Sequence, residues 1–384
     1  MAASNSLSKI SAKRTEACVA AGAPARVVLI LVFSYTVPMK LALFLALAAA
    51  QWQPLTVPSK ASFRGLTAVD DNIVWVSGTE GTVLRTTDAG KTWDTLKVPK
   101  AEGLDFRGVR AFDDKTAVLM SSGPAEKGQA RVYRTTDGGK TWTLVLEEKS
   151  KGAFFDCVAF WDPKHGILLG DPIDGHFMVY TTADGGETWQ RVAPEKLPEA
   201  LPNEGAFAAS NSCLALEGSN FAWFATGGGS VARVFRSTNL GQSWFVFNTP
   251  VQPHNASTGI FSLVFQGELH GMAVGGDYQQ PDALFPNPLN ANDGGRAWHG
   301  IGQPQGRFLS SIAVAPGFGR MPGKVYAAGP SGIYALTPFG AWAQQSDLNV
   351  NVVSFPSNRS GWAAGPKGLI AHWNIEAPAG LQKP

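Results

Sequence analysis

The stretch YRTTDGGKTWTLV, residues 133–145, joins two short β-prone runs through an aspartate, two glycines and a lysine. Such residues also build phosphate-binding and metal-binding loops. The pattern recurs along the chain, however, and a catalytic loop is normally needed only once. Related stretches are LRTTDAGKTWDTL (84–96), YTTADGGETWQRV (180–192), FRSTNLGQSWFVF (235–247), NANDGGRAWHGIG (290–302) and an eroded ALTPFGAWAQQ (335–345).

The tryptophans of these copies are separated by 49, 47, 55, 54 and 44 residues. Periods of about 40–50 residues indicate repeated supersecondary units. The copies therefore predict a scaffold of repeated sheets in which each tryptophan begins a strand and buries its ring against neighbours. These anchors are Trp93, Trp142, Trp189, Trp244, Trp298 and, in the eroded copy, Trp342.

Each copy has the residues of a tight turn. The acidic or amide side chain accepts hydrogen bonds from backbone N–H groups just after it, and the glycine two positions on tolerates a positive φ. Asparagine replaces aspartate in one copy and the lysine is not kept, which argues against a metal or phosphate loop. The predicted turn residues are Asp88, Asp137, Asp184, Asn239 and Asp293, with Gly90, Gly139, Gly186, Gly241 and Gly295.

The first 50 residues differ from the rest. From Met39 onward, MKLALFLALAAAQ has one lysine, an apolar run and the small residues Ala48-Ala49-Ala50, which is the pattern of a secretory signal cleaved near Ala50. We therefore expect residues 1–50 to be a leader, over-extended before a true start at Met39, and the mature protein to be periplasmic or extracellular. The alternative is an N-terminal membrane anchor, because the run approaches the ~20 apolar residues of a span.

Charge and cysteine content limit the partners and the chemistry. Residues 51–384 hold 27 basic against 29 acidic residues, so we expect no nucleic acid partner. Outside the leader, Cys157 and Cys213 remain. An exported protein can join them, but we expect buried free thiols and leave the disulfide open.

Seven units can be counted upstream of the turns. Each contains a strand that ends in small residues and glycine, such as WVSG at Gly78 or WFATG at Gly227, preceded by an innermost strand such as DFRGVRAF, FFDCVAFW or AFAASNSC. Four short strands per unit are typical of a propeller blade. We therefore predict an all-β, seven-bladed β-propeller of four-stranded antiparallel blades over 51–376, with a tail over 377–384.

The last unit lacks a fourth strand, because the chain leaves GLIAHW (368–373) without a turn motif. At the other end, WQPLTVP (52–58) resembles the fourth-strand segment WDTLKVP (93–99) of the first unit. We predict that residues 52–58 supply the outermost strand of blade seven. Such closure hides edge strands that would otherwise pair with other chains.

The repeated turn resembles the Asp-box, or bacterial neuraminidase repeat, of sialidases, xyloglucanases, sortilin-type receptors and photosystem II stability/assembly factors. GTVLRTTDAGKTW preceded by WVSG is most similar to the assembly factors, and SFRGL, DFRGV, AFFDCVAFWD, ARVFRST, GIFS and AVGGDY resemble their bacterial relatives, which often carry the label oxidoreductase. This resemblance covers about 60–375. It implies a non-enzymatic binder of membrane-protein intermediates, although one fold hosts many functions.

Polar residues recur at one position of the innermost strands, where a propeller commonly binds ligands over its hub. Guanidinium groups at this position suit planar anions such as carboxylates. The alternative is a solvated channel with internal ion pairs. The aligned residues are Arg64, Arg107, Asp156, Ser210, Ser262, Ser310 and Asn351.

Long connections in blades three to five flag the same face, because loops on a rigid scaffold commonly carry binding residues. These connections are 170–177, 227–233 and 275–290. Plain loop variation is the alternative. The candidates that they add are Asp171, Asp174, Arg233, Asp277 and Tyr278.

Catalytic readings have weaker support. A sialidase-like glycan hydrolase requires an arginine triad, which Arg64 and Arg107 imitate only with Arg233 or Arg307, and a tyrosine with a carboxylate base. The catalytic candidates are Asp156, Glu204 and Tyr278. The chain shows no dinucleotide fingerprint, C-x-x-C pair or H-x-x-H spacing, so we expect neither cofactor nor metal.

We therefore expect an exported, monomeric, non-catalytic module that binds a protein or a small polar or anionic ligand. Membrane-protein complexes at the envelope are included among its expected partners. The alternatives are an extracytoplasmic glycan hydrolase and, third, an oxidoreductase of the kind named by the relatives' label.

Overall fold

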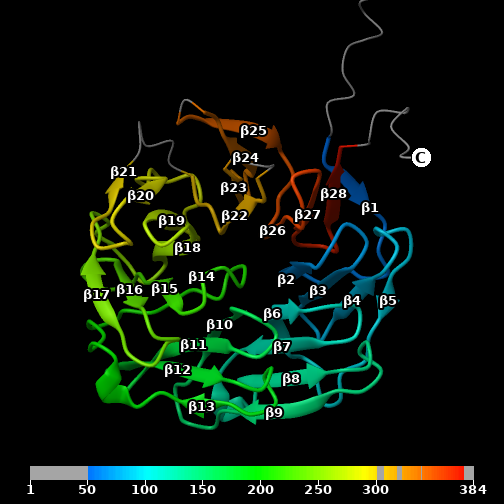
Figure 1. The fold of residues 1–384 in the computed structure, drawn as a ribbon, viewed down its shortest axis with the longest axis horizontal. Coiled ribbons are helices and arrows are strands. Elements are labelled where there is room, and N and C mark those ends of the chain that lie inside the picture. The colour runs from blue at the N-terminus through cyan, green and yellow to red at the C-terminus, as the bar shows by residue number, and fades with distance from the viewer. Residues whose placement is uncertain (1–50, 301–306, 318–321, 339, 376–384) are drawn as a thin grey trace, which may run out of the picture. The chain divides into compact units, whose positions relative to one another are not determined.

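The computed structural model describes residues 51–300, 307–317, 322–338 and 340–375. Seven four-stranded antiparallel sheets follow one another around a central hub, and the innermost strand of each lies nearest the centre (Figure 1). The predicted seven-bladed β-propeller is confirmed. Each blade repeats the same four-stranded antiparallel arrangement.

The strands of each blade are given from the hub outward. Blade one has β2 (Phe63–Ala68), β3 (Val74–Gly78), β4 (Val83–Thr86) and β5 (Asp94–Thr95). Blade two has β6 (Asp105–Ala111), β7 (Ala117–Ser122), β8 (Arg131–Thr135) and β9 (Thr143–Glu147). Blade three has β10 (Phe155–Phe160), β11 (Gly166–Ile173), β12 (His176–Thr182) and β13 (Gln190–Arg191). Blade four has β14 (Leu214–Glu217), β15 (Phe221–Ala225), β16 (Arg233–Ser237) and β17 (Phe245–Asn248).

Blade five has β18 (Thr258–Gln266), β19 (His270–Asp277), β20 (Leu289–Ala291) and β21 (His299–Gly300). Blade six has β22 (Ser311–Ala315), β23 (Lys324–Gly329), β24 (Gly332–Leu336) and β25 (Trp342–Ser346). Blade seven has β26 (Val352–Ser354), β27 (Ser360–Ala364) and β28 (Ile370–Asn374), with β1 (Gln53–Leu55) outermost. Two short 3-10 helices, η1 (Ala125–Lys127) and η2 (Pro194–Lys196), lie in connections.

The N-terminal strand closes the ring as predicted. β1 pairs with β28 in antiparallel register, with Gln53 opposite His372 and Leu55 opposite Ile370. Trp52 is buried just before β1, with its ring 6.0 Å from that of Phe355 and 6.4 Å from that of Trp373. Blade seven is therefore built from both ends of the described chain.

The repeated turns have the predicted geometry. In blade two, the Asp137 carboxylate accepts hydrogen bonds from the N–H of Thr141 at 2.9 Å and from its hydroxyl at 2.7 Å. The N–H of Gly139 donates to the hydroxyl of Thr135 at 3.0 Å, and Gly139 has a φ of +79°. The same pattern holds around Asp88 and Asp184. Asn239 likewise accepts the N–H of Ser243, but its amide donates to the Ser243 hydroxyl, so these copies are confirmed as structural turns.

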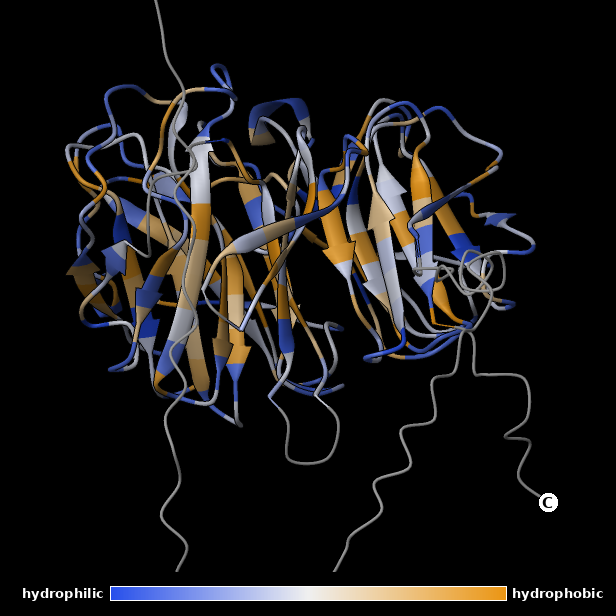
Figure 2. Cartoon of the chain, turned by 90° about the horizontal axis from the view of Figure 1, so that it is seen from above, coloured by the Kyte–Doolittle hydropathy of each residue, from blue (hydrophilic) through white to orange (hydrophobic). Residues whose placement is uncertain are grey.

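The turns also bind each blade to the one before it. A Cβ on Gly139 would lie 2.6 Å from the end of the Leu96 side chain in blade one, and a larger residue would also be strained at its positive φ. Tryptophans join the blades in a similar way: the Trp223 indole N–H donates to the Gly294 carbonyl at 2.9 Å. Apolar bands cross the strands while the turns at both ends are hydrophilic (Figure 2), so the core lies between neighbouring sheets.

The predicted leader, 1–50, with its start at Met39 and cleavage near Ala50, lies outside the described residues, as does the tail over 377–384. Among the described residues, no helix is long and apolar enough to span a membrane.

Candidate functional site: two pockets in a divided hub

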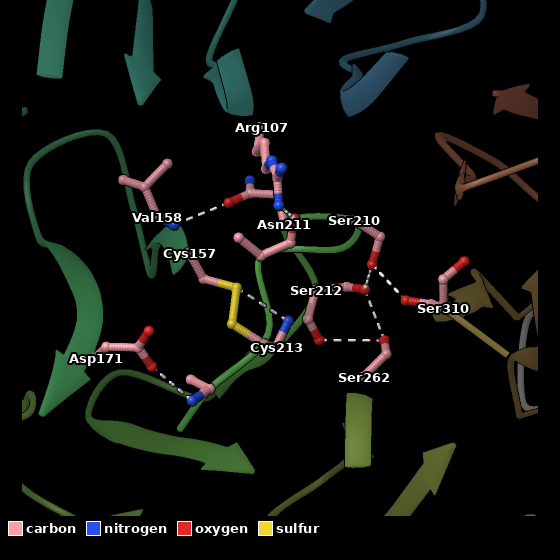
Figure 3. The surroundings of a disulfide bond; sticks show 12 residues. Arg107, Cys157, Val158, Asp171, Ser210, Asn211, Ser212, Cys213, Ser262 and Ser310 are labelled. Atoms are coloured by element: carbon pink, nitrogen blue, oxygen red, sulfur yellow. Dashed lines mark hydrogen bonds between the residues drawn. A yellow bond between two sulfur atoms is a disulfide. The ribbon is translucent and has the colours of Figure 1, made fainter. Parts of the chain in front are cut away.

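The connection that leads from blade three into blade four runs through the middle of the ring. Residues 205–213, called here the crossing segment, were predicted in part as the innermost strand of blade four, but that strand begins only at Leu214. The segment instead bonds to other blades (Figure 3). Its Ser210 hydroxyl donates to the Ser310 carbonyl of blade six at 2.6 Å, and its Ser212 hydroxyl lies 2.6 Å from that of Ser262 in blade five.

The crossing segment also contacts blades one to three. Arg64 and Arg107 donate to its carbonyls at Ala209 and Ala208, at 3.4 and 3.3 Å, respectively. The Asn211 side-chain oxygen accepts the backbone N–H of Val158 at 2.8 Å. Because serine and asparagine side chains satisfy neighbouring backbone groups in this way, the segment need not pair as a strand.

A disulfide ends the crossing segment. Cys213 is bonded to Cys157 of β10, at a sequence separation of 56 and with Cα atoms 6.1 Å apart. The expectation of free thiols is therefore wrong. The sequence places the two cysteines in neighbouring blades but does not show the path of the crossing segment. That path brings Cys213 beside β10.

The crossing segment divides the hub into two pockets. The large hub pocket, of about 780 Å³, is lined by residues 203–209 and by the first residues of the innermost strands, such as Arg64 and Arg107. The small hub pocket, of about 290 Å³, is lined by residues 210–212 and by later residues of the same strands, such as Leu66 and Arg110.

Two guanidinium groups stand on the blade-one and blade-two side of the large hub pocket. Arg64 and Arg107 each occupy the position where the pairing register of the innermost strand shifts, so a β-bulge turns their side chains into the hub. Arg107 forms an ion pair with Asp105 at 2.7 Å. Burial, and then the neighbouring Arg107, lower the pKa of Arg64, as expected for cations held close together in a sheltered site.

Two carboxyl groups follow on blade three. Asp156 is also a bulge residue and is 1% exposed, and its Oδ2 atom has no hydrogen-bond partner among the described residues. Burial, and then Asp171, raise the pKa of Asp156, while Arg107 acts in the opposite direction. Burial raises the pKa of Asp171 to about 6, although it accepts the Ala206 N–H at 2.9 Å. Burial therefore favours the protonated form of both carboxyl groups.

An aromatic cluster forms the side of the large hub pocket that lies across the ring from the arginines. The rings of Phe207 and Phe261 are stacked with centroids 3.7 Å apart, and Phe308 meets Phe261 edge-on at 4.7 Å. Tyr278 stands at the rim, 51% exposed and 6.2 Å from Phe261. The sequence alignment put Ser262 at the hub, but the bulge in blade five falls at Phe261, and Ser262 is fully buried.

The remaining candidates have internal partners or lie elsewhere. Arg233 forms a buried ion pair with Glu204, whose carboxylate also accepts the Thr226 hydroxyl at 2.6 Å. The Asp277 carboxylate accepts hydrogen bonds from the Asn255 amide at 2.9 Å and from the Ser257 hydroxyl at 2.6 Å. Burial alone would raise the pKa of Asp277, but hydrogen bonds that include these two lower it to about 2. Asp174 is exposed on a turn outside the large hub pocket.

The large hub pocket therefore gathers most, but not all, of the candidate residues. Those that line it are Arg64, Arg107, Asp156, Asp171, Glu204, Tyr278, Ser310 and Asn351. Ser210 lines the small hub pocket instead. Phe207, Phe261 and Phe308 were missed by the sequence analysis, because an aromatic residue near an apolar strand does not differ in pattern from one in the core.

The residues considered for a sialidase-like mechanism do not form a catalytic arrangement in the large hub pocket. The carboxylate of Glu204 is bound to Arg233, so it is not a free base for Tyr278. Arg307, the other residue considered for an arginine triad, is exposed and lies 3.9 Å from Asp282. No group of three or more metal-ligating side chains occurs in the described part of the chain.

The ring, its turns and the divided hub define a seven-bladed β-propeller with a large pocket over the hub. Residues 45–155 match the family described as photosynthesis system II assembly factor YCF48. A solved structure of YCF48 bound to D1 peptide superposes with a TM-score of 0.62 at 18% identity, covering 86% of this chain and 97% of that one. The fold is therefore that of a seven-bladed β-propeller, and residues 45–155 are similar to the photosystem II assembly factor family.

Other propellers share the fold alone. The WD40 β-propeller domain of Doa1 gives a TM-score of 0.57 at 12% identity and covers 85% of this chain and 98% of that one. An ancestral GH74 enzyme gives 0.57 at 16% identity, covering 84% of this chain but 46% of the enzyme. No curated protein matches the chain.

Proposed function

We propose that this protein is a non-catalytic assembly module that holds a segment of a protein partner in the large hub pocket. One observation carries the proposal: two guanidinium groups and an aromatic cluster stand on opposite sides of one pocket of about 780 Å³. The solved structure of YCF48 with a D1 peptide supports a protein partner for a propeller of this type.

The proposed segment carries an anionic group beside a large apolar side chain. A carboxylate suits Arg64 and Arg107, because guanidinium groups donate paired hydrogen bonds to planar anions. An apolar side chain suits Phe207, Phe261 and Phe308, which are largely buried but line the pocket. Aromatic and arginine residues in a sheltered pocket are the residue types that dominate binding energy at protein interfaces.

Export is part of this proposal. The disulfide between Cys157 and Cys213 supports it, because disulfides persist in oxidising compartments outside the cytoplasm. The module would then meet membrane-protein partners on the outer side of the cytoplasmic membrane.

The test compares the double variant Arg64→Ala/Arg107→Ala with wild type in the binding of peptides and in the capture of a protein partner. In the first measurement, peptides that carry a carboxylate next to a large apolar residue are titrated against the protein. In the second, the protein is used to capture its partners from the envelope fraction. The double variant should lose at least tenfold in peptide affinity and fail in capture while its melting temperature stays close to wild type. Arg359→Ala, at an exposed position in blade seven, is the matched control. Unchanged peptide affinity and capture in the double variant would contradict the proposal.

A glycan-active hydrolase is the second candidate, and the Asp156–Asp171 pair favours it. Glycosidases use two carboxyl groups, one of them kept protonated by burial. A screen on a polysaccharide panel separates the two functions. Turnover that is lost in Asp156→Asn supports the hydrolase, and no turnover on any member of the panel removes it.

A further inference from the structure

The small hub pocket contains a charge without a counter-ion. Arg110, on β6, is the one charged residue among the described residues that line it. Its Nε atom donates to the Val158 carbonyl at 3.2 Å, and no carboxylate within the described ranges lies in ion-pair distance of it. Burial lowers the pKa of Arg110, and no charged neighbour acts in the opposite direction.

A second donor lines the same pocket. Asn211 is 4% exposed, and its Oδ1 atom is engaged by the Val158 N–H. Its amide group Nδ2 has no hydrogen-bond acceptor in the described part of the chain, because the side-chain hydrogen bond of Asn211 involves Oδ1. Because Oδ1 must face Val158, the amide cannot exchange its two ends without losing that bond.

The other polar groups of the small hub pocket are already satisfied. The Ser210 hydroxyl donates to the Ser310 carbonyl, and the Ser212 hydroxyl bonds to Ser262. The pocket is thus left with guanidinium and amide donors and with no acidic side chain among the described residues that line it. A sheltered cation without a partner costs free energy, which a bound anion would offset.

We propose that the small hub pocket is a binding site for a small oxyanion, held by the Arg110 guanidinium and the Asn211 amide. The ligand is a carboxylate or phosphate group on a small molecule, because guanidinium forks and amide donors match the oxygens of both. The site lies on the other side of the crossing segment from the large hub pocket, so it is independent of the proposed protein partner.

Calorimetric titration with inorganic phosphate and with acetate, in buffer free of other oxyanions, tests the site. The wild-type protein should bind at least one of the two probes at a single site, and the probe that binds identifies a phosphate or a carboxylate ligand. Arg110→Gln should weaken that binding at least tenfold. The double variant Arg64→Gln/Arg107→Gln should keep it within twofold, since those arginines line the large hub pocket.

Asn211→Asp provides a second test that preserves the fold. The aspartate keeps an acceptor for the Val158 N–H but replaces the amide donor with a negative charge, so anion binding should be lost while the melting temperature stays near wild type. The proposal is overturned if neither probe binds, if binding survives both Arg110→Gln and Asn211→Asp, or if only Arg64→Gln/Arg107→Gln removes it.

Discussion

Asn211 and Val158 are joined by a hydrogen bond of 2.8 Å, in which a side chain from the blade-four connection accepts a backbone N–H of the blade-three inner strand. Asn211 has a φ of +55°, a conformation that asparagine tolerates better than most residues. The bond therefore fixes the crossing segment against β10 at the centre of the ring.

Replacing this side chain should loosen the crossing segment. Asn211→Ala leaves the buried Val158 N–H without an acceptor, which costs about 1–3 kcal/mol, and it places alanine in a strained conformation. Urea denaturation measures the loss, and hydrogen exchange should show faster exchange of the Val158 amide. Asn211→Asp, which keeps the acceptor, is the control and should lose much less. Equal stability of Asn211→Ala and wild type would show that the segment is held by its other bonds.

The disulfide should be the strongest single tie of the crossing segment. It closes a loop with a sequence separation of 56 residues, for which chain-entropy arguments give a stabilisation of about 4 kcal/mol. We expect Cys157→Ala/Cys213→Ala to lower the urea midpoint accordingly. Strong reductant should lower the midpoint of the wild type but not that of the double variant. A wild-type midpoint that does not respond to reductant under unfolding conditions would contradict this.

The sequence predicted the repeated parts of the fold better than the unique ones. Aspartate, glycine and tryptophan at fixed spacing report local turn chemistry, so the blades and the closing strand followed from the pattern. Arg64, Arg107 and Asp156 were aligned with one another because each sits at the same bulge of its strand.

The parts that the sequence did not predict depend on contacts between blades. A one-residue difference in where the bulge falls puts Phe261 rather than Ser262 at the hub. The path of residues 205–213 depends on hydrogen bonds to Ser310 and Val158, which lie far away in the chain. Local patterns do not contain such long-range information, so the division of the hub and the disulfide emerged only from the structure.

Lowering the pH should change the contributions of the hub and of the turns to the free energy of unfolding in opposite directions. The folded-state pKa of Asp171, about 6, lies above its ordinary value of 3.8. The folded state therefore binds more protons, and the cost of burying this carboxylate is relieved as pH falls from 7 towards 4, by at most about 3 kcal/mol. Thr141 lowers the pKa of Asp137 to about 2, so its contribution is present above pH 4 and lost towards pH 2.

Asp171→Asn isolates the hub contribution. The amide cannot titrate but keeps an acceptor for the Ala206 N–H, while Asp156 and Arg107 remain beside it. The free energy of unfolding of wild type, relative to Asp171→Asn, should rise between pH 7 and pH 4. Parallel pH profiles of the two proteins would show that Asp171 titrates at its ordinary value. Asp137→Asn, in a turn, should leave the difference between pH 7 and pH 4 unchanged.

Closure of the ring depends on one side chain at its N-terminal edge. Trp52 packs against Phe355 and Trp373, and β1 behind it covers the otherwise open edge of β28. Removing a buried tryptophan side chain costs about 3–5 kcal/mol, and Trp52→Ala also loosens the only strand that joins the two ends of the described ring. We therefore expect this variant to expose β28 and to aggregate on heating, whereas Trp52→Phe keeps part of the contact and stays soluble. Light scattering during a thermal ramp distinguishes them. If Trp52→Ala loses stability without aggregating, the tryptophan contributes packing but β1 closes the ring without it.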